Sequence, residues 1–176
     1  MRYTFCTLAL IALALPAYQG DVHAGASREI FTIYLVRHAE KDSASANPDN
    51  PGLASCGQLR SQALAVILSE IDLNEIYSTG YRRTLNTAAP IAASKQLEVT
   101  EYDPSKLEEF ARLLRSRKQD ALVVGHSNTT GVLAGLIAGE KGEEMAEDNY
   151  DSMYQVVSSG DQSRVYLLQQ AFDCRF

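Results

Sequence analysis

The chain has 176 residues, of which 45% are hydrophobic and 22% are charged. This composition is typical of a globular protein, and the length is sufficient for one sizeable core. The formal net charge of −6 excludes the broad basic surface that binding to nucleic-acid phosphates requires. An anionic small molecule would therefore have to be bound by a local cluster of positive groups.

The N-terminus has the pattern of an export signal. Arg2 supplies a positive start, residues 8–15 form an unbroken apolar run, and Val22-His23-Ala24 offers a small-residue cleavage site. The run is too short to span a bilayer, which takes ~18 residues or more. We expect a signal peptide over 1–24 and a single domain over 25–176, in the periplasm or secreted. A buried N-terminal helix and an uncleaved anchor are the alternatives.

Cleavage would remove one of the three cysteines, Cys6, and leave Cys56 and Cys174. In an oxidising compartment these two either pair or remain separate free thiols, and the sequence favours neither. The chain has no CxxC and no Cys/His cluster at ligand spacing, so we expect no structural zinc site.

Strand-like runs alternate with helix-like runs along the chain. Strands are expected at residues 30–36, 75–78, 97–100 and 121–124, and helices at about 81–95 and 129–138, with two more after the loop 42–51 and after Asp103. Two final runs, 152–157 and 164–168, indicate a closing hairpin. The alternation predicts an α/β fold with three layers (α/β/α), a mostly parallel sheet and a C-terminal antiparallel hairpin.

Finer predictions concern the helices. Helical spacing predicts the buried face of the first one from Leu59, Ala63, Val66 and Ile67. Pro90 is expected to kink the helix 81–95 or to interrupt its hydrogen bonds. Asp103 followed by Pro104 predicts an N-cap with proline at the first helical position.

Two histidines each follow an apolar strand: His38 comes after residues 30–36, and His126 comes just after 121–124. Parallel strands place their carboxyl ends at one edge of the sheet, so both imidazoles should meet there with Arg37 and Arg83. Two guanidiniums suit a phosphate dianion. A neutral imidazole can attack phosphorus to form a phosphohistidine, although a lone histidine at a strand end is more often a hydrogen-bonded structural residue.

Four segments resemble the motifs of a known family. They are residues 35–40 (LVRHAE), 53–60 (LASCGQLR), 77–88 (YSTGYRRTLNTA) and 123–129 (VVGHSNT). The first is similar to the RHG/RHA signature of the histidine phosphatase superfamily, which includes phosphoglycerate mutases and many phosphatases. The others follow in the order of the family's remaining motifs.

The resemblance implies a role for each matching residue. His38 would be the phosphorylated nucleophile, and Arg37, Arg83 and His126 would hold the phosphoryl group. The motif places the arginine at Arg83 rather than at Arg82. It also implies a single α/β/α domain and no need for a metal or other cofactor.

The proton donor to the leaving oxygen is less defined. Larger members carry an acidic residue after the third strand or directly after the second histidine, where this chain has Ser127. Glu101 is the preferred donor here. Asp103 is the alternative, although it also fits the cap of its helix.

The sequence therefore predicts an exported phosphomonoester hydrolase that acts on a small phosphorylated substrate, such as a surface-glycan or sugar phosphate. The short gap between Arg83 and His126 argues against a phosphoglycerate mutase. The alternatives are a phosphohistidine or phosphoprotein phosphatase and a catalytically silent phosphate-binding module. The acidic segment 140–150 is expected to be a solvated loop; the alternatives are that it repels anionic tails or selects a cationic one. The pattern does not predict an oligomeric state.

Overall fold

The computed structural model describes residues 29–174, so the predicted signal peptide lies outside the described residues. The order of elements is β1 (Ile30–Arg37), α1 (Ser55–Ile67), β2 (Glu75–Ser78), α2 (Arg82–Lys95), β3 (Val99–Glu101), α3 (Leu107–Arg117), β4 (Ala121–Gly125), α4 (Thr130–Ala138), β5 (Ser152–Ser159) and β6 (Gln162–Gln169). The predicted alternation of strands and helices is confirmed.

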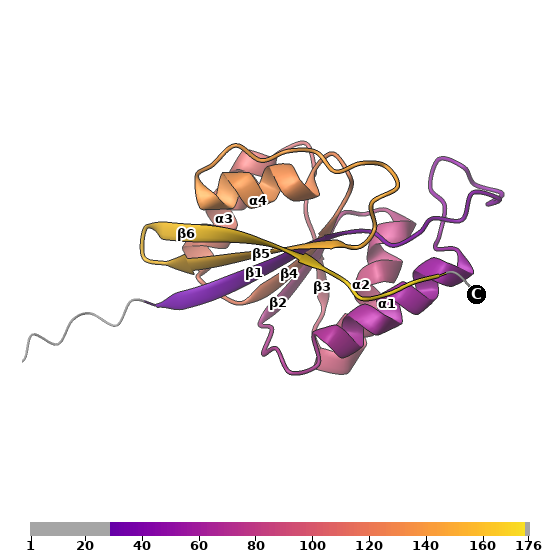
Figure 1. The fold of residues 1–176 in the computed structure, drawn as a ribbon, viewed down its shortest axis with the longest axis horizontal. Helices are drawn as coiled ribbons and strands as arrows, with labels where there is room; N and C mark the ends of the chain where they lie inside the picture. Colours follow the sequence, from indigo (N-terminus) through magenta and orange to yellow (C-terminus); the bar gives the residue numbers. More distant parts are fainter. Residues whose placement is uncertain (1–28, 175–176) are drawn as a thin grey trace, which may run out of the picture.

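One six-stranded sheet, of order β3-β2-β4-β1-β5-β6, forms the middle layer (Figure 1). The first four strands in that order are parallel to one another, and β5 and β6 join as an antiparallel hairpin. The fold class expected from the sequence is confirmed, including the hairpin. Because β4 and β1 are neighbours at the centre, the residues that follow them emerge side by side.

Each face of the sheet has its own apolar core. Alternate residues of β1 divide between them: Ile33 and Leu35 pack with α3 and α4, whereas Tyr34 and Val36 pack with α1 and α2. This is the period-two alternation of a strand covered on both sides. The two helix layers appear on opposite sides of the sheet in Figure 1.

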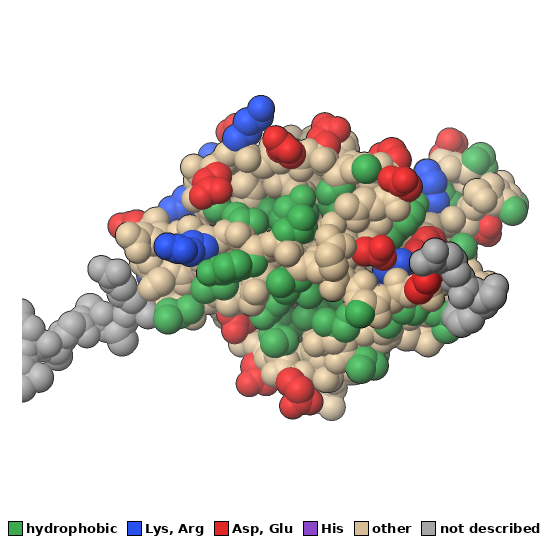
Figure 2. Space-filling model, viewed as in Figure 1, with side chains coloured by type: hydrophobic (Ala, Val, Ile, Leu, Met, Phe, Trp, Pro, Cys, Tyr) green, Lys and Arg blue, Asp and Glu red, His purple; other side chains and the backbone are tan. Residues whose placement is uncertain are grey.

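The outer strand of the hairpin is more open than the rest of the sheet. Tyr166 and Leu167 on β6 are about half exposed, and apolar side chains gather over this strand in Figure 2. The sheet's buried core thus ends at β6. Within residues 29–174, none of the helices has the length and apolar character needed to cross a membrane.

The predicted buried face of α1 is wrong. Leu59, Val66 and Ile67 are 42%, 73% and 43% exposed, and Ala63 is only partly buried. The helix instead buries Gly57, Arg60, Ser61 and Leu64.

The inward face of α1 is fixed by two contacts with the loop after His38. Arg60 pairs with Glu40 at 2.7 Å. Gly57 lies so close to this loop that a Cβ would meet the Glu40 carbonyl oxygen at 2.3 Å.

The predicted start of the third helix also needs correction. Helix α3 begins at Leu107 rather than after Asp103, because the Asp103 carboxylate accepts hydrogen bonds from the backbone and hydroxyl of Ser105 and closes a local turn. Helix α2 runs from Arg82 to Lys95 with Pro90 inside it, and the kink expected there stays a prediction.

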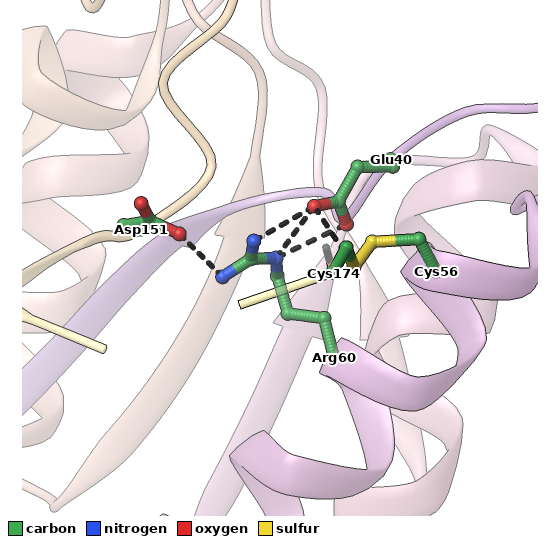
Figure 3. The surroundings of a disulfide bond; sticks show 5 residues. All are labelled: Glu40, Cys56, Arg60, Asp151 and Cys174. Carbon is green, nitrogen blue, oxygen red and sulfur yellow. Dashed lines mark hydrogen bonds and ion pairs between the residues drawn. A yellow bond between two sulfur atoms is a disulfide. The ribbon is translucent and has the colours of Figure 1, made fainter. Parts of the chain in front are cut away.

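Cys56 and Cys174 form a disulfide, which decides the alternative that the sequence left open (Figure 3). Their Cα atoms are 5.7 Å apart across 118 residues of sequence separation. The bond attaches the C-terminal segment to α1 beside an ionic cluster around the buried Arg60. In that cluster Arg60 lies between Glu40 and Asp151, with its guanidinium 4.7 Å from the Phe172 ring centroid.

Candidate active site

The carboxyl ends of β1 and β4 bring the two predicted histidines together. Arg37 and Gly125 are paired in register, and the His38 amide donates to the Gly125 carbonyl at 2.9 Å. The rings of His38 and His126 then lie edge to face, with centroids 5.4 Å apart. Both residues are buried.

His38 is held in one tautomer. Its Nδ1 lies 2.8 Å from the Ala39 carbonyl oxygen, and because a carbonyl only accepts, Nδ1 carries the proton. The lone pair of the neutral ring is therefore on Nε2. That is the arrangement a nucleophilic imidazole requires.

His126 is fixed from both ring nitrogens. Arg83 Nη2 lies 3.5 Å from Nδ1 and can only donate, so Nε2 carries the proton and faces Thr79 Oγ1 at 2.9 Å. Thr79 in turn contacts the Thr84 hydroxyl at 2.9 Å. The arginine that the sequence motif selects, Arg83, is therefore the one beside His126. Its guanidinium also stacks on Tyr81, 4.5 Å from the ring centroid.

Arg37 is buried and almost fully engaged. Its Nη1 donates to the carbonyls of Ala146 at 3.2 Å, Glu147 at 2.6 Å and Asn149 at 3.4 Å. Its Nη2 forms an ion pair with the Glu147 carboxylate at 2.9 Å, and its guanidinium lies 4.3 Å from the Tyr150 ring centroid. Its buried Nε has no hydrogen-bond partner among residues 29–174.

The environment keeps both imidazoles neutral. Burial, aided by the charge of Arg37, lowers the pKa of His38 from 6.5 to about 3, against the opposing effect of the Ala39 hydrogen bond. Burial and then Arg83 and Arg37 lower the pKa of His126 to about 4. The Ser127 hydroxyl and Arg37 hold the pKa of Glu147 below its ordinary value. The site thus combines neutral imidazoles with fixed positive guanidiniums.

These shifts predict an acid-sensitive fold. A histidine whose pKa falls on folding destabilises the native state below its unfolded pKa, because the unfolded chain then binds the extra proton. Between pH 7 and pH 5 each of the two histidines should lower the free energy of unfolding by about 2 kcal/mol. Denaturant titrations at the two pH values measure the change. The His38→Asn variant should lose about half of the histidine contribution, and an unchanged pH dependence would contradict the shift.

Glu101 and Asp103, the two predicted proton donors, make no hydrogen bond or ion pair with the histidines among the described residues. Glu101 ends β3, with its carboxylate against Gly80, where an added Cβ would meet Oε2 at 2.7 Å. Both residues line a cavity of about 650 Å³ beside α3 that contains neither histidine, Arg37 nor Arg83. Among the described residues neither contacts His38 or His126, and the donor role of Glu101 stays a prediction.

Several residues of the site were not found by sequence reasoning. Thr79 and Thr84 orient His126, while Glu147 and Tyr150 contact Arg37. Thr79 and Thr84 lie inside the third motif segment, so their position was a usable signal. Glu147 and Tyr150 gave none, because they reach Arg37 from 110 and 113 positions along the chain.

One group of potential metal ligands occurs among the described residues: Glu40, Cys56 and Cys174. The two sulfur atoms are joined in the disulfide, and metal binding by cysteine uses the thiolate. This group therefore does not fit a metal centre. Beside the histidines, the charged groups are guanidiniums and one carboxylate, which suit an anion rather than a cation.

Comparison with known proteins shows a likeness to one family. A family model described as "Histidine phosphatase superfamily (branch 1)" matches residues 33–111. A curated relative, the 2,3-bisphosphoglycerate-dependent phosphoglycerate mutase of Thermoplasma acidophilum, is 29% identical over 135 residues. That match covers 74% of this chain and 64% of the mutase, so the chain spans under two thirds of its relative.

Solved structures share the fold. The alpha-ribazole phosphatase from Shigella flexneri matches with a TM-score of 0.64 at 14% identity, over 79% of this chain and 96% of that one. The protein histidine phosphatase SixA complexed with tungstate matches with a TM-score of 0.62 at 15% identity, over 78% and 96%. The chain is therefore similar to the histidine phosphatase superfamily over residues 33–111. The family match supports a phosphatase, and the solved structures show the shared fold.

Proposed function

We propose that the protein is a phosphomonoester hydrolase that works without a metal through a phosphohistidine intermediate on His38. One observation carries the proposal: a buried imidazole, neutral and held with its Nε2 lone pair free, lies beside two arginines and a second histidine. A phosphoryl dianion is the ligand that such a cluster suits.

The reaction follows from these positions. His38 Nε2 attacks phosphorus, the N–P bond forms, and the bond to the leaving oxygen breaks as that oxygen receives a proton. Arg37 and Arg83 balance the charge on the non-bridging oxygens. Water then attacks the phosphohistidine and releases inorganic phosphate, which restores the neutral ring.

The proposed setting is the periplasm or the cell exterior, with a surface-glycan or sugar phosphate as substrate. The signal-like N-terminus supports export, and a disulfide between Cys56 and Cys174 is typical of an oxidising compartment. A phosphohistidine or phosphoprotein substrate is the second candidate, favoured by the likeness in fold to the histidine phosphatase SixA.

Release of phosphate from p-nitrophenyl phosphate in the presence of EDTA tests the proposed reaction. We expect turnover that EDTA does not reduce, and an acid-labile phosphoenzyme when the reaction is quenched in base. Activity that EDTA removes and added metal restores would contradict the mechanism. Phosphate binding without turnover of any phosphomonoester, from pH 4 to pH 8, would instead indicate a binding module.

A further inference from the structure

The proton donor is the one part of the proposed mechanism that the predicted residues do not supply. Glu101 and Asp103 face the cavity beside α3, and the position after the second histidine holds Ser127, which is not an acid. The donor must stand within hydrogen-bond reach of the leaving oxygen. Among the described residues, the carboxyl group that contacts the cluster comes from another segment.

Ser127 itself brings a carboxylate to that position. Its hydroxyl donates to Glu147 Oε1, while Glu147 Oε2 forms the ion pair with Arg37 Nη2. The same carboxylate acts electrostatically on His126 and Arg83. Glu147 thus places its carboxyl group beside the second histidine and against the predicted phosphoryl site.

The backbone around Glu147 is held in place. Met145 is buried, and its amide donates to the Ser127 carbonyl at 2.8 Å. Gly142 lies against the backbone of α4, where a Cβ would meet the Gly131 carbonyl at 2.2 Å. Arg37 also donates hydrogen bonds to three carbonyls of residues 146–149. These tertiary contacts together fix the position of Glu147.

The different burial of His38 and Glu147 fits in-line transfer of a phosphoryl group. The nucleophile is at the bottom of the site, since His38 is 3% exposed. The leaving oxygen departs on the side of phosphorus opposite Nε2, toward solvent. The Glu147 side chain is 77% exposed, so it lies at the mouth, on the side where a proton is needed.

We infer that Glu147, bound by Ser127 and Arg37, is the proton donor to the leaving oxygen and the base in the second half of the reaction. This inference rests on the proposed function. The phosphoryl group displaces the carboxyl group from Arg37, and its negative charge favours the protonated form. The proton passes to the leaving oxygen as the P–O bond breaks. The carboxylate then takes a proton from the water that attacks the phosphohistidine.

Leaving-group dependence tests the inference. Phenyl phosphate and p-nitrophenyl phosphate are similar in shape, but phenolate, whose conjugate acid has a pKa of ~10, needs protonation far more than p-nitrophenolate. The kcat/KM ratio of the two substrates is measured for the wild type, Glu147→Gln, Glu101→Gln and Asp148→Asn. Gln keeps the shape of the side chain, and Asp148 is the neighbouring exposed carboxylate in the same loop.

We expect Glu147→Gln to lose at least about tenfold more kcat/KM on phenyl phosphate than on p-nitrophenyl phosphate. The ratio should stay at the wild-type value in Glu101→Gln and Asp148→Asn. A misfolded fraction does not alter the ratio, because both substrates meet the same active enzyme. An equal loss on both substrates, a selective loss in Glu101→Gln, or a wild type that hydrolyses only p-nitrophenyl phosphate would overturn the inference. A wild type inactive on both would reject the proposed function itself.

Discussion

Replacing His38 with asparagine should lower the turnover of p-nitrophenyl phosphate by at least about a thousandfold, because the variant has no nucleophile. Asparagine is the suitable replacement, since its side-chain amide can keep the hydrogen bond that Nδ1 makes with the Ala39 carbonyl. It lacks an equivalent of Nε2. The loss would therefore report on the attacking atom rather than on the packing around it.

His126→Asn is the matched control for His38→Asn. It removes an imidazole of similar burial at the same edge of the sheet, but it leaves Nε2 of His38 in place. Turnover should fall in this variant while the phosphoenzyme still forms and can be trapped. If His38→Asn also gave a trapped phosphoenzyme, another residue would be the nucleophile.

Removing the disulfide should have the largest effect on stability. The bond constrains the unfolded chain across 118 residues. In a double Cys56→Ala, Cys174→Ala variant this constraint is absent, and the free energy of unfolding should fall by about 4–5 kcal/mol on the chain-entropy model. Whole domains have only about 5–15 kcal/mol of stability. Guanidinium unfolding of the wild type and the variant, each with and without reductant, measures the difference.

The reductant separates the bond from the side chains. Wild-type protein should lose stability on reduction, whereas the double variant should not change. A second consequence is local: the C-terminal segment carries Phe172 over Arg60, so its release should loosen the cluster with Glu40 and Asp151. Equal stability of oxidised and reduced wild type would show that the bond contributes nothing.

The sequence predicted the fold class and the histidine cluster for a simple reason. The apolar runs that end at Arg37 and Gly125 are buried strands, and parallel strands deliver whatever follows them to one edge. Because β1 and β4 are direct neighbours, a local pattern was enough to place His38 beside His126. The motif spacing then selected Arg83 over Arg82.

The errors came from contacts between distant residues. From the apolar spacing, the face of α1 with Leu59 and Val66 was predicted to be buried. Gly57 and Arg60 face inward instead, because Glu40 and Asp151, from two other segments, contact them there. Local spacing carries no information about such partners. The error in the start of α3 was local: Asp103 closes a turn with Ser105 instead of capping the helix.

By itself, then, the sequence determined the α/β sheet, the final hairpin and a pair of histidines flanked by arginines, since strand burial and motif spacing are local properties of the chain. Only the tertiary structure decided the pairing of Cys56 with Cys174, the orientation of α1 and the carboxylate on Arg37. These contacts join different segments of the chain, from 17 positions apart for Glu40 and Gly57 to 118 for the two cysteines. Such contacts depend on how the layers pack, and no local pattern encodes them.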